Sequence, residues 1–219
     1  MMGNAADKGS GEGHGGGVSL AENIAFLTGN IIRQNHASST GAGLLLDGGQ
    51  AQLENTAVID NQGSGLHLIC GAQLDAWHIT LARNGDSAIR LALSSDCEGQ
   101  PGAPSTAVFT NTILASHSVG AFVSADSSLA LHGILWHDTP IAFQLEPNAG
   151  LSTSWQYAGD PLFAADGHHI TTGSAARFKG LPTTVSRDID GQEPPLDNPA
   201  PGADEYWQAS YFLPVIQKE

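Results

Sequence analysis

Four charged residues are the side chains of this sequence best suited to acid–base chemistry: Asp60, Arg83, Asp86 and Arg90. A carboxylate can act as the base that removes a proton from a sugar, while an arginine neutralises the acidic group beside that proton. This is the chemistry that a polysaccharide lyase needs. Charged residues of the same kind also occur as solvated turn residues, so the four are candidates for catalysis and the alternative stays open.

Aromatic side chains offer a second kind of chemistry, because their faces give broad apolar contact to sugar rings. Trp136, Trp155 and Tyr157 are the candidate binding residues. Trp77 has a different place in the repeat described below, and we expect it to be a bulky turn or core residue.

Metal-ligating residues are less convincing in sequence. His168 and His169 are adjacent, but a pair of histidines without an evident third ligand does not define a metal site. The segment 188–191, Asp-Ile-Asp-Gly, begins like a calcium-binding loop, yet its glycine comes too early and no glutamate completes an EF-hand. We therefore expect no metal site and no cofactor, with calcium as the remaining alternative.

These candidates belong to a repeating scaffold. An aliphatic residue followed three positions later by asparagine recurs at steps of 26 and 23 residues, as Ile32/Asn35, Val58/Asn61 and Leu81/Asn84. Repeats of this length indicate stacked structural units. Short runs of alternating apolar residues, separated by Gly, Asn, Asp and Ser, indicate strands and turns.

The sequence therefore predicts an all-β solenoid, a parallel β-helix of about five to six coils in which equivalent residues stack about 4.8 Å apart. The expected inward ladder consists of aliphatic side chains: Ile32, Val58, Leu81, Ile113 and Ile134. The expected asparagine ladder shapes left-handed turns and bonds along the stack: Asn35, Asn61 and Asn84, with Ser116 and His137 at the corresponding later positions.

The repeats are expected over 1–158, which leaves a non-repeating segment over 159–206 and a tail over 207–219. A long step before Ile113 locates an insertion at 94–105, whose Pro and Gly content is typical of a surface loop. Loops on such scaffolds often carry function, although the insertion could equally be a decorative excursion.

Cysteine positions bear on the same loop. Cys70 matches Leu93 in register, which places Cys97 in the loop of the next coil. Adjacent coils could bring the two thiols together, so a Cys70–Cys97 disulfide is possible, and two free thiols are the alternative.

Charge and hydropathy exclude some classes of function. The chain has 22 acidic against 8 basic residues and a net charge of −14, which argues against a nucleic-acid partner. No apolar stretch approaches the roughly 20 residues that cross a bilayer. Residues 1–8 lack the features of a secretory signal, and 9–17 read like a loop that ends a coil. We expect a monomer whose N-terminus is truncated, the C-terminal part of a longer protein.

Several segments of the later chain follow one another in a characteristic order: 111–114, 134–137, 159–163, 167–170, 173–176, 188–191, 194–195 and 202–206. In this order the chain resembles uncharacterised β-helix proteins with a choice-of-anchor Q type C-terminal region. The coils resemble the right-handed, single-stranded parallel β-helix repeats of bacterial surface and secreted proteins in the pectin-lyase-like group. Glu193 and Pro201 depart from that pattern, where a basic and an aliphatic residue are usual.

The resemblance implies that 159–206 caps the exposed edge of the last coil and that the protein is extracellular or at the cell surface. We expect a non-catalytic segment that serves adhesion or contact with a polysaccharide or cell-surface glycan. The alternative is a carbohydrate-active enzyme, a polysaccharide lyase or glycoside hydrolase, with its site in a groove between strand faces and inserted loops.

Overall fold

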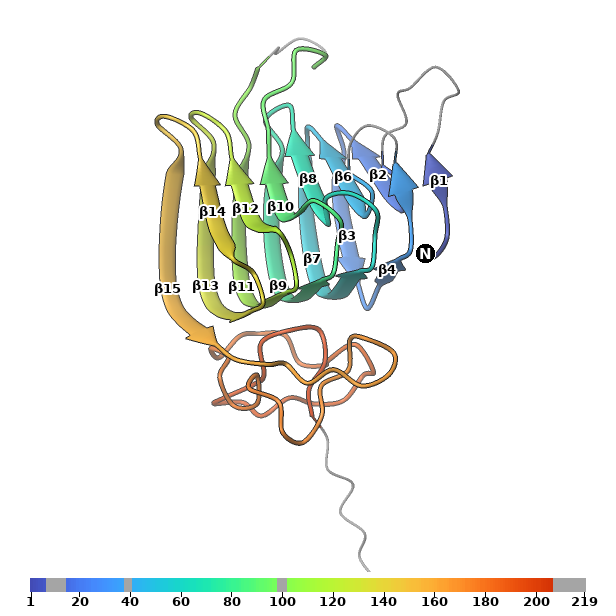
Figure 1. Ribbon diagram of the computed structural model, residues 1–219, viewed down its shortest axis with the longest axis vertical. Coiled ribbons are helices and arrows are strands. Elements are labelled where there is room, and N and C mark those ends of the chain that lie inside the picture. The colour runs from blue at the N-terminus through green and yellow to red at the C-terminus, as the bar shows by residue number, and fades with distance from the viewer. Residues whose placement is uncertain (7–14, 38–40, 98–101, 207–219) are drawn as a thin grey trace, which may run out of the picture.

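The computed structural model describes residues 1–6, 15–37, 41–97 and 102–206. Its strands stack as a parallel β-solenoid of about six turns, and the described residues contain no helix (Figure 1). The predicted all-β, parallel β-helix fold is therefore confirmed. No helix long and apolar enough to span a membrane is found in the described ranges. The tail over 207–219 and positions 98–101 of the insertion lie outside these ranges.

Each turn gives one short strand to a first sheet and one longer strand to a second. The first sheet contains β2 (Val18–Ala21), β6 (Leu44–Asp47), β8 (Leu66–Ile69), β10 (Ser87–Leu91), β12 (Val119–Val123) and β14 (Ile141–Leu145). The second contains β3 (Ile24–Thr28), β7 (Gln50–Ile59), β9 (Gln73–Ala82), β11 (Thr106–Ala115), β13 (Ser128–His137) and β15 (Gly150–Ala158). In the first turn, β4 (Ile31–Arg33) also pairs with β7, and β1 (Ala5–Ala6) pairs with β5 (His36–Ala37).

Left-handed residues bend the long strands of the second sheet. Asn55, His78 and Asn111 have φ values of 46°, 55° and 57° and stand at the same place in β7, β9 and β11. Asparagine and histidine are enriched in this conformation, which bulkier residues avoid. Each of these long strands therefore has two straight halves that run in different directions. The side chain of the left-handed residue between the halves points out of the solenoid.

One apolar core fills the space between the sheets, and Ile32, Val58 and Leu81 stack in it as predicted. The next members of this ladder are Leu114 and Trp136, so the prediction of Ile113 and Ile134 was wrong. The insertion makes the repeat one residue longer than the sequence pattern indicates. A slip of one residue moves a strand side chain to the opposite face.

The side chains of these two isoleucines lie in different apolar clusters. Ile113 points out of the solenoid and joins a second apolar cluster with residues of the C-terminal segment. Ile134 remains in the main core, but in the neighbouring ladder that contains Thr56, Ile79 and Thr112.

The asparagine ladder is present and buried, with Asn35, Asn61 and Asn84 at 0–4% exposure. It continues at His117, whose Nε2 lies 3.2 Å from Nδ2 of Asn84, and not at the predicted Ser116. The asparagines do not supply the left-handed turns that we expected. The residues before them do: Gln34, Asp60 and Arg83, with Ser116 as the later equivalent.

The C-terminal segment 159–206 is irregular, and Figure 1 shows it lying along one flank of the solenoid. Its Ile170, Ala176, Ala200 and Ala203 cover the outward-facing halves of β7, β9 and β11. The segment therefore packs on the flank of the solenoid and not, as we expected, over the exposed edge of the last coil. Among the described residues, β14 and β15 are the outermost strands of their sheets, and no further strand pairs with them.

The bends of the long strands hold this segment in place. Asn111 donates from Nδ2 to the Leu181 carbonyl at 2.8 Å and accepts the Leu181 N–H at 2.7 Å. His78 Nε2 lies 2.9 Å from the Thr183 hydroxyl, and Asn55 donates to the Arg187 carbonyl at 2.5 Å. The left-handed positions thus shape the solenoid and attach the chain that follows it.

Candidate functional site

A groove of about 630 Å³ lies on the outer face of the first sheet, over β8 and β10. Strand register places His67 and Arg90 side by side on this face. The turns before the strands and the loop after β10 form the walls. The polar side chains lining the groove are Ser64, His67, Asp86, Arg90, Ser94 and Asp96.

Arg90 is the cation of this groove. Its guanidinium stacks on the Phe122 ring of the adjacent strand, with Cζ 4.3 Å from the ring centroid. Its Nη1 lies 3.7 Å from a carboxylate oxygen of Asp86, which also accepts a hydrogen bond from the Ser64 hydroxyl at 3.0 Å. The stacking and the ion pair fix a planar donor beside an acceptor, an arrangement that can hydrogen-bond a polyhydroxylated ligand.

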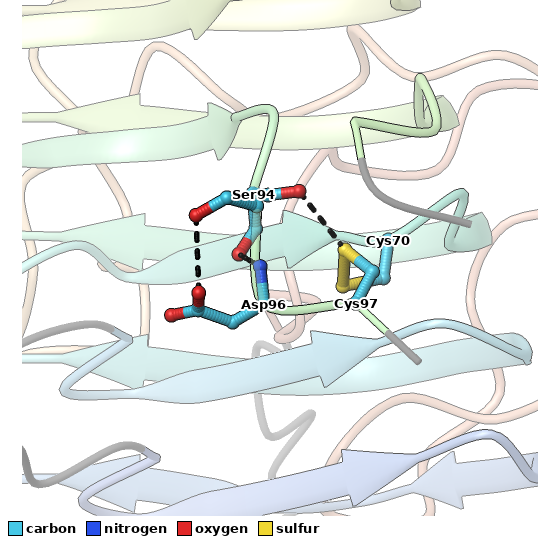
Figure 2. Close-up of a disulfide and its surroundings, with 5 residues drawn as sticks. Cys70, Ser94, Asp96 and Cys97 are labelled. Atoms are coloured by element: carbon cyan, nitrogen blue, oxygen red, sulfur yellow. Dashed lines mark hydrogen bonds between the residues drawn. A yellow bond between two sulfur atoms is a disulfide. The ribbon is translucent and has the colours of Figure 1, made fainter. Parts of the chain in front are cut away.

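A disulfide between Cys70 and Cys97 holds one wall of the groove, with their Cα atoms 5.3 Å apart (Figure 2). Cys70 follows β8, whereas Cys97 belongs to the insertion. Next to it, Asp96 donates its backbone N–H to the Ser94 hydroxyl at 3.2 Å. The cross-link therefore ties the start of the insertion to the preceding coil and keeps Asp96 at the rim.

The structure separates the four predicted catalytic residues into two pairs. Asp86 and Arg90 line the groove, whereas Asp60 and Arg83 occupy equivalent corner positions of adjacent coils next to the C-terminal segment. Arg83 Nε donates to Asp60 at 2.7 Å, and its Nη2 donates to the Gly167 carbonyl at 3.0 Å. This second pair joins the solenoid to the C-terminal segment, so the four residues do not form one acid–base strip.

The three aromatic candidates do not form a common platform. Trp136 packs against the main core and meets Phe143 edge to face at 5.4 Å. Tyr157 packs against the second apolar cluster, beneath Lys179. Trp155 is 63% exposed at the bend of β15. Their side chains point in different directions because each occupies a different place in its coil.

A cluster of histidine and aspartate side chains lies within the C-terminal segment. Asp166, His168 and His169 bring ligand-type atoms within 4.8 Å of one another, and so do His169, Asp190 and Asp204. His169 Nδ1 lies 2.6 Å from Asp166, and its Nε2 lies 2.9 Å from Asp190. The sequence showed only the adjacent histidines as a candidate site. Asp166 lies two positions before His168, whereas Asp190 and Asp204 belong to turns 21 and 35 positions after His169.

Burial and mutual charge shift the pKa values in this cluster. Burial lowers the pKa of His168, and the neighbouring His169 lowers it further. Burial also opposes protonation of His169, but Asp166, Asp204 and Asp190 outweigh it and raise its pKa. Burial raises the pKa of Asp204 to about 7, although the Ile170 N–H bound to its carboxylate opposes the shift.

The Asp-Ile-Asp-Gly segment forms a hydrogen-bonded turn. Asp188 Oδ1 accepts the N–H groups of Asp190 and Gln192 at 2.9 and 2.8 Å, and its Oδ2 accepts the Glu205 N–H at 3.2 Å. Backbone amides thus already engage both carboxylate oxygens. Asp188 therefore organises the turn that presents Asp190 to His169.

Comparisons with known proteins identify no relative of this chain. No family model matches the chain, and no curated protein or solved structure is significantly similar to it. The assignment of the fold rests on the strand pairing described above.

Proposed function

We propose that this chain is a non-catalytic, extracellular or cell-surface β-solenoid segment that binds a polysaccharide in the groove over β8 and β10. The observation that carries the proposal is the Arg90 guanidinium, fixed between Phe122 and Asp86 on the floor of that groove. A flat donor beside a carboxylate acceptor matches the paired hydroxyl groups of a sugar ring. The solenoid extends the binding face along the stack.

The charge of the chain favours an uncharged glycan. The groove is lined by two carboxylates, Asp86 and Asp96, and by one guanidinium, that of Arg90, with His67 counted as neutral. The whole chain has a net charge of −14. A polyuronate would be repelled by this field. The resemblance to the pectin-lyase-like group and the choice-of-anchor Q region supports a glycan partner of a surface protein, and both family assignments are part of this proposal.

The disulfide supports the extracellular location. Cross-links between cysteines persist in oxidising compartments and are rare in reducing ones. Here the Cys70–Cys97 bond shapes the wall of the groove, so the proposed site depends on that environment. The C-terminal part of a longer surface protein would meet this condition.

Binding to an array of neutral and uronic-acid oligosaccharides tests the proposal. We expect binding to a neutral subset and at least a tenfold loss of affinity in Arg90→Gln and Asp86→Asn, because each removes one charge of the ion pair and with it the charge-assisted hydrogen bonds to the ligand. Asp75→Asn is the matched control: Asp75 is exposed on the outer face of β9, away from the groove. Its affinity should equal that of the wild type.

Three results would reject the proposal. The first is binding that Arg90→Gln and Asp86→Asn leave unchanged, and the second is no binding to any glycan. The third is the release of unsaturated or reducing sugar products, which would identify a lyase or hydrolase and make the groove an active site.

A further inference from the structure

His168 is the least expected member of the C-terminal cluster. Only 4% of its surface is exposed, and both of its ring nitrogens are buried without a hydrogen-bond partner among the described residues. An imidazole normally places at least one nitrogen on a partner when it is buried. Its Nδ1 instead points toward Asp166 Oδ1, at a separation of 3.4 Å.

That separation is long for a hydrogen bond and suits two ligands of one metal ion. Zinc–nitrogen and zinc–oxygen bonds of about 2.0–2.2 Å in a tetrahedral site put ligand atoms about 3.3 Å apart. His169 completes the group: one ligand-type atom from each of the three residues lies within 4.8 Å of the others. Its Nδ1 hydrogen-bonds to the other Asp166 oxygen, Oδ2, at 2.6 Å, and a bound metal ion would replace that contact. Two imidazole nitrogens and one carboxylate oxygen form a donor set suited to zinc and similar ions.

The surroundings resemble the outer shell of such a site. His169 Nε2 lies 2.9 Å from Asp190 Oδ2, although the pair is not aligned as a hydrogen bond. A carboxylate behind a metal-bound histidine fixes the orientation of the ring and raises its basicity. Asp166 Oδ1 also accepts the backbone N–H groups of His168 and His169, both at 3.1 Å, which folds the three ligands into one turn.

We propose that Asp166, His168 and His169 bind one divalent transition-metal ion, with Zn²⁺ as the reference ion, and that the ion fastens the C-terminal segment through Asp190. This inference is independent of the proposed glycan site. The two ring nitrogens of His169 face Asp166 on one side and Asp190 on the other. Metal binding on the Asp166 side would therefore lock the turn around 166–169 against the turn around 188–191.

Isothermal titration of the full, chelator-treated chain with Zn²⁺ tests the site. We expect one saturable site and an increase in melting temperature of roughly 5 °C at saturating metal, reversed by chelator. Co²⁺ provides a spectroscopic readout, because a four-coordinate site with nitrogen ligands gives visible absorption that Zn²⁺ lacks.

Three variants decide whether the named residues are the ligands. Asp166→Asn keeps the oxygen that accepts the two backbone N–H groups, so the turn should fold while affinity falls by on the order of a hundredfold. His168→Gln should lose affinity to a similar extent. His36→Gln is the matched control, because His36 is exposed on β5, and its affinity should not change.

Circular dichroism and urea melts of the metal-free variants separate unfolding from ligand loss. Absence of saturable Zn²⁺ binding by the wild type would overturn the proposal. So would binding that survives in both Asp166→Asn and His168→Gln, or that falls equally in His36→Gln.

Discussion

Asn35 donates two hydrogen bonds to Oδ1 of Asn61, one from its backbone N–H at 3.0 Å and one from its side-chain Nδ2 at 2.9 Å. Asn61 repeats the arrangement toward Asn84, with distances of 3.2 and 2.9 Å, and also donates to the Ile32 carbonyl. The carboxamides of Asn61 and Asn84 therefore each satisfy one backbone N–H and one backbone carbonyl of the preceding coil. The ladder joins successive turns at a corner where the backbone alone would leave buried donors unpaired.

We expect Asn61→Ala to lower the free energy of unfolding by about 3 kcal/mol, because it leaves two donors of Asn35 and the Ile32 carbonyl without partners. Asn30→Ala is the control, since the Asn30 side chain bonds the Thr28 carbonyl within its own turn. It should cost less than about 1 kcal/mol. Urea denaturation measures both values, and equal losses would refute a special role for the ladder.

The disulfide should stabilise both the fold and the groove. It closes a loop of 27 residues, for which a chain-entropy treatment gives a contribution of about 3–4 kcal/mol. The Cys70→Ser/Cys97→Ser double variant should melt at a lower temperature. It should also bind glycan more weakly under conditions where it is fully folded, because the wall that contains Asp96 is released. Unchanged affinity in a folded double variant would show that the wall is not part of the site.

Two buried histidines should make the fold sensitive to acid. Burial lowers the pKa of His78 to about 4, although the carbonyls of Ala200 and Gly202 partly oppose the shift. Burial also lowers the pKa of His117 to about 4, with a smaller contribution from the charge of Arg83. Above about pH 6.5 both imidazoles are neutral in the folded and the unfolded chain, so their contribution to stability is then complete.

As the pH falls from about 6.5 to 4, the unfolded chain binds protons that the folded chain excludes, and stability falls by about 3 kcal/mol for each histidine. Below pH 4 the loss levels off. His117→Gln keeps an acceptor for the Asn84 amide and does not titrate, so it should reduce the difference in unfolding free energy between pH 7 and pH 4.5. An unchanged difference would remove His117 from this account.

Gly202 should be intolerant of a side chain. Its φ is +101°, and a Cβ there would lie 2.6 Å from Ile113 Cδ1 and 3.0 Å from the Thr80 hydroxyl. Gly202→Ala should therefore cost about 3 kcal/mol and expose the C-terminal segment to limited proteolysis. Gly191→Ala shares the positive φ, at +81°, but has open space around its Cβ. It should cost about 1 kcal/mol, and equal proteolysis of the two variants would argue against the clash.

The repeat itself could be read from the sequence, because stacking equivalent residues forces the same residue types to recur at each turn. Ile32, Val58 and Leu81 show this, and so do the three asparagines. The error began at the insertion, where a difference of one residue replaced Leu114 by Ile113 in the predicted ladder. Nothing in the local sequence distinguishes two adjacent aliphatic residues, whereas the hydrogen-bonded register does.

The candidate sites were less accessible to sequence reasoning. Asp86 and Arg90 share a groove because they lie on one coil, whereas the sequence alone grouped them with Asp60 and Arg83. The Asp60–Arg83 pair instead contacts the C-terminal segment, because Arg83 donates to the Gly167 carbonyl. Those two residues are 84 positions apart, so nothing in the sequence indicated the contact. His168 and His169 lacked a third ligand in sequence, although Asp166 was only two positions away, because only the folded turn shows that its carboxylate faces their ring nitrogens.

By itself, the sequence determined the solenoid: its approximate repeat length, its inward aliphatic positions before the insertion and the asparagine ladder all follow from local periodicity. Only the tertiary structure decided where the C-terminal segment lies. Its apolar residues bury Ile113 on the flank, and its backbone engages the bends at Asn55, His78 and Asn111. Those contacts join positions up to 132 residues apart, and no periodic signal encodes the docking of a non-repeating chain onto a repeating one.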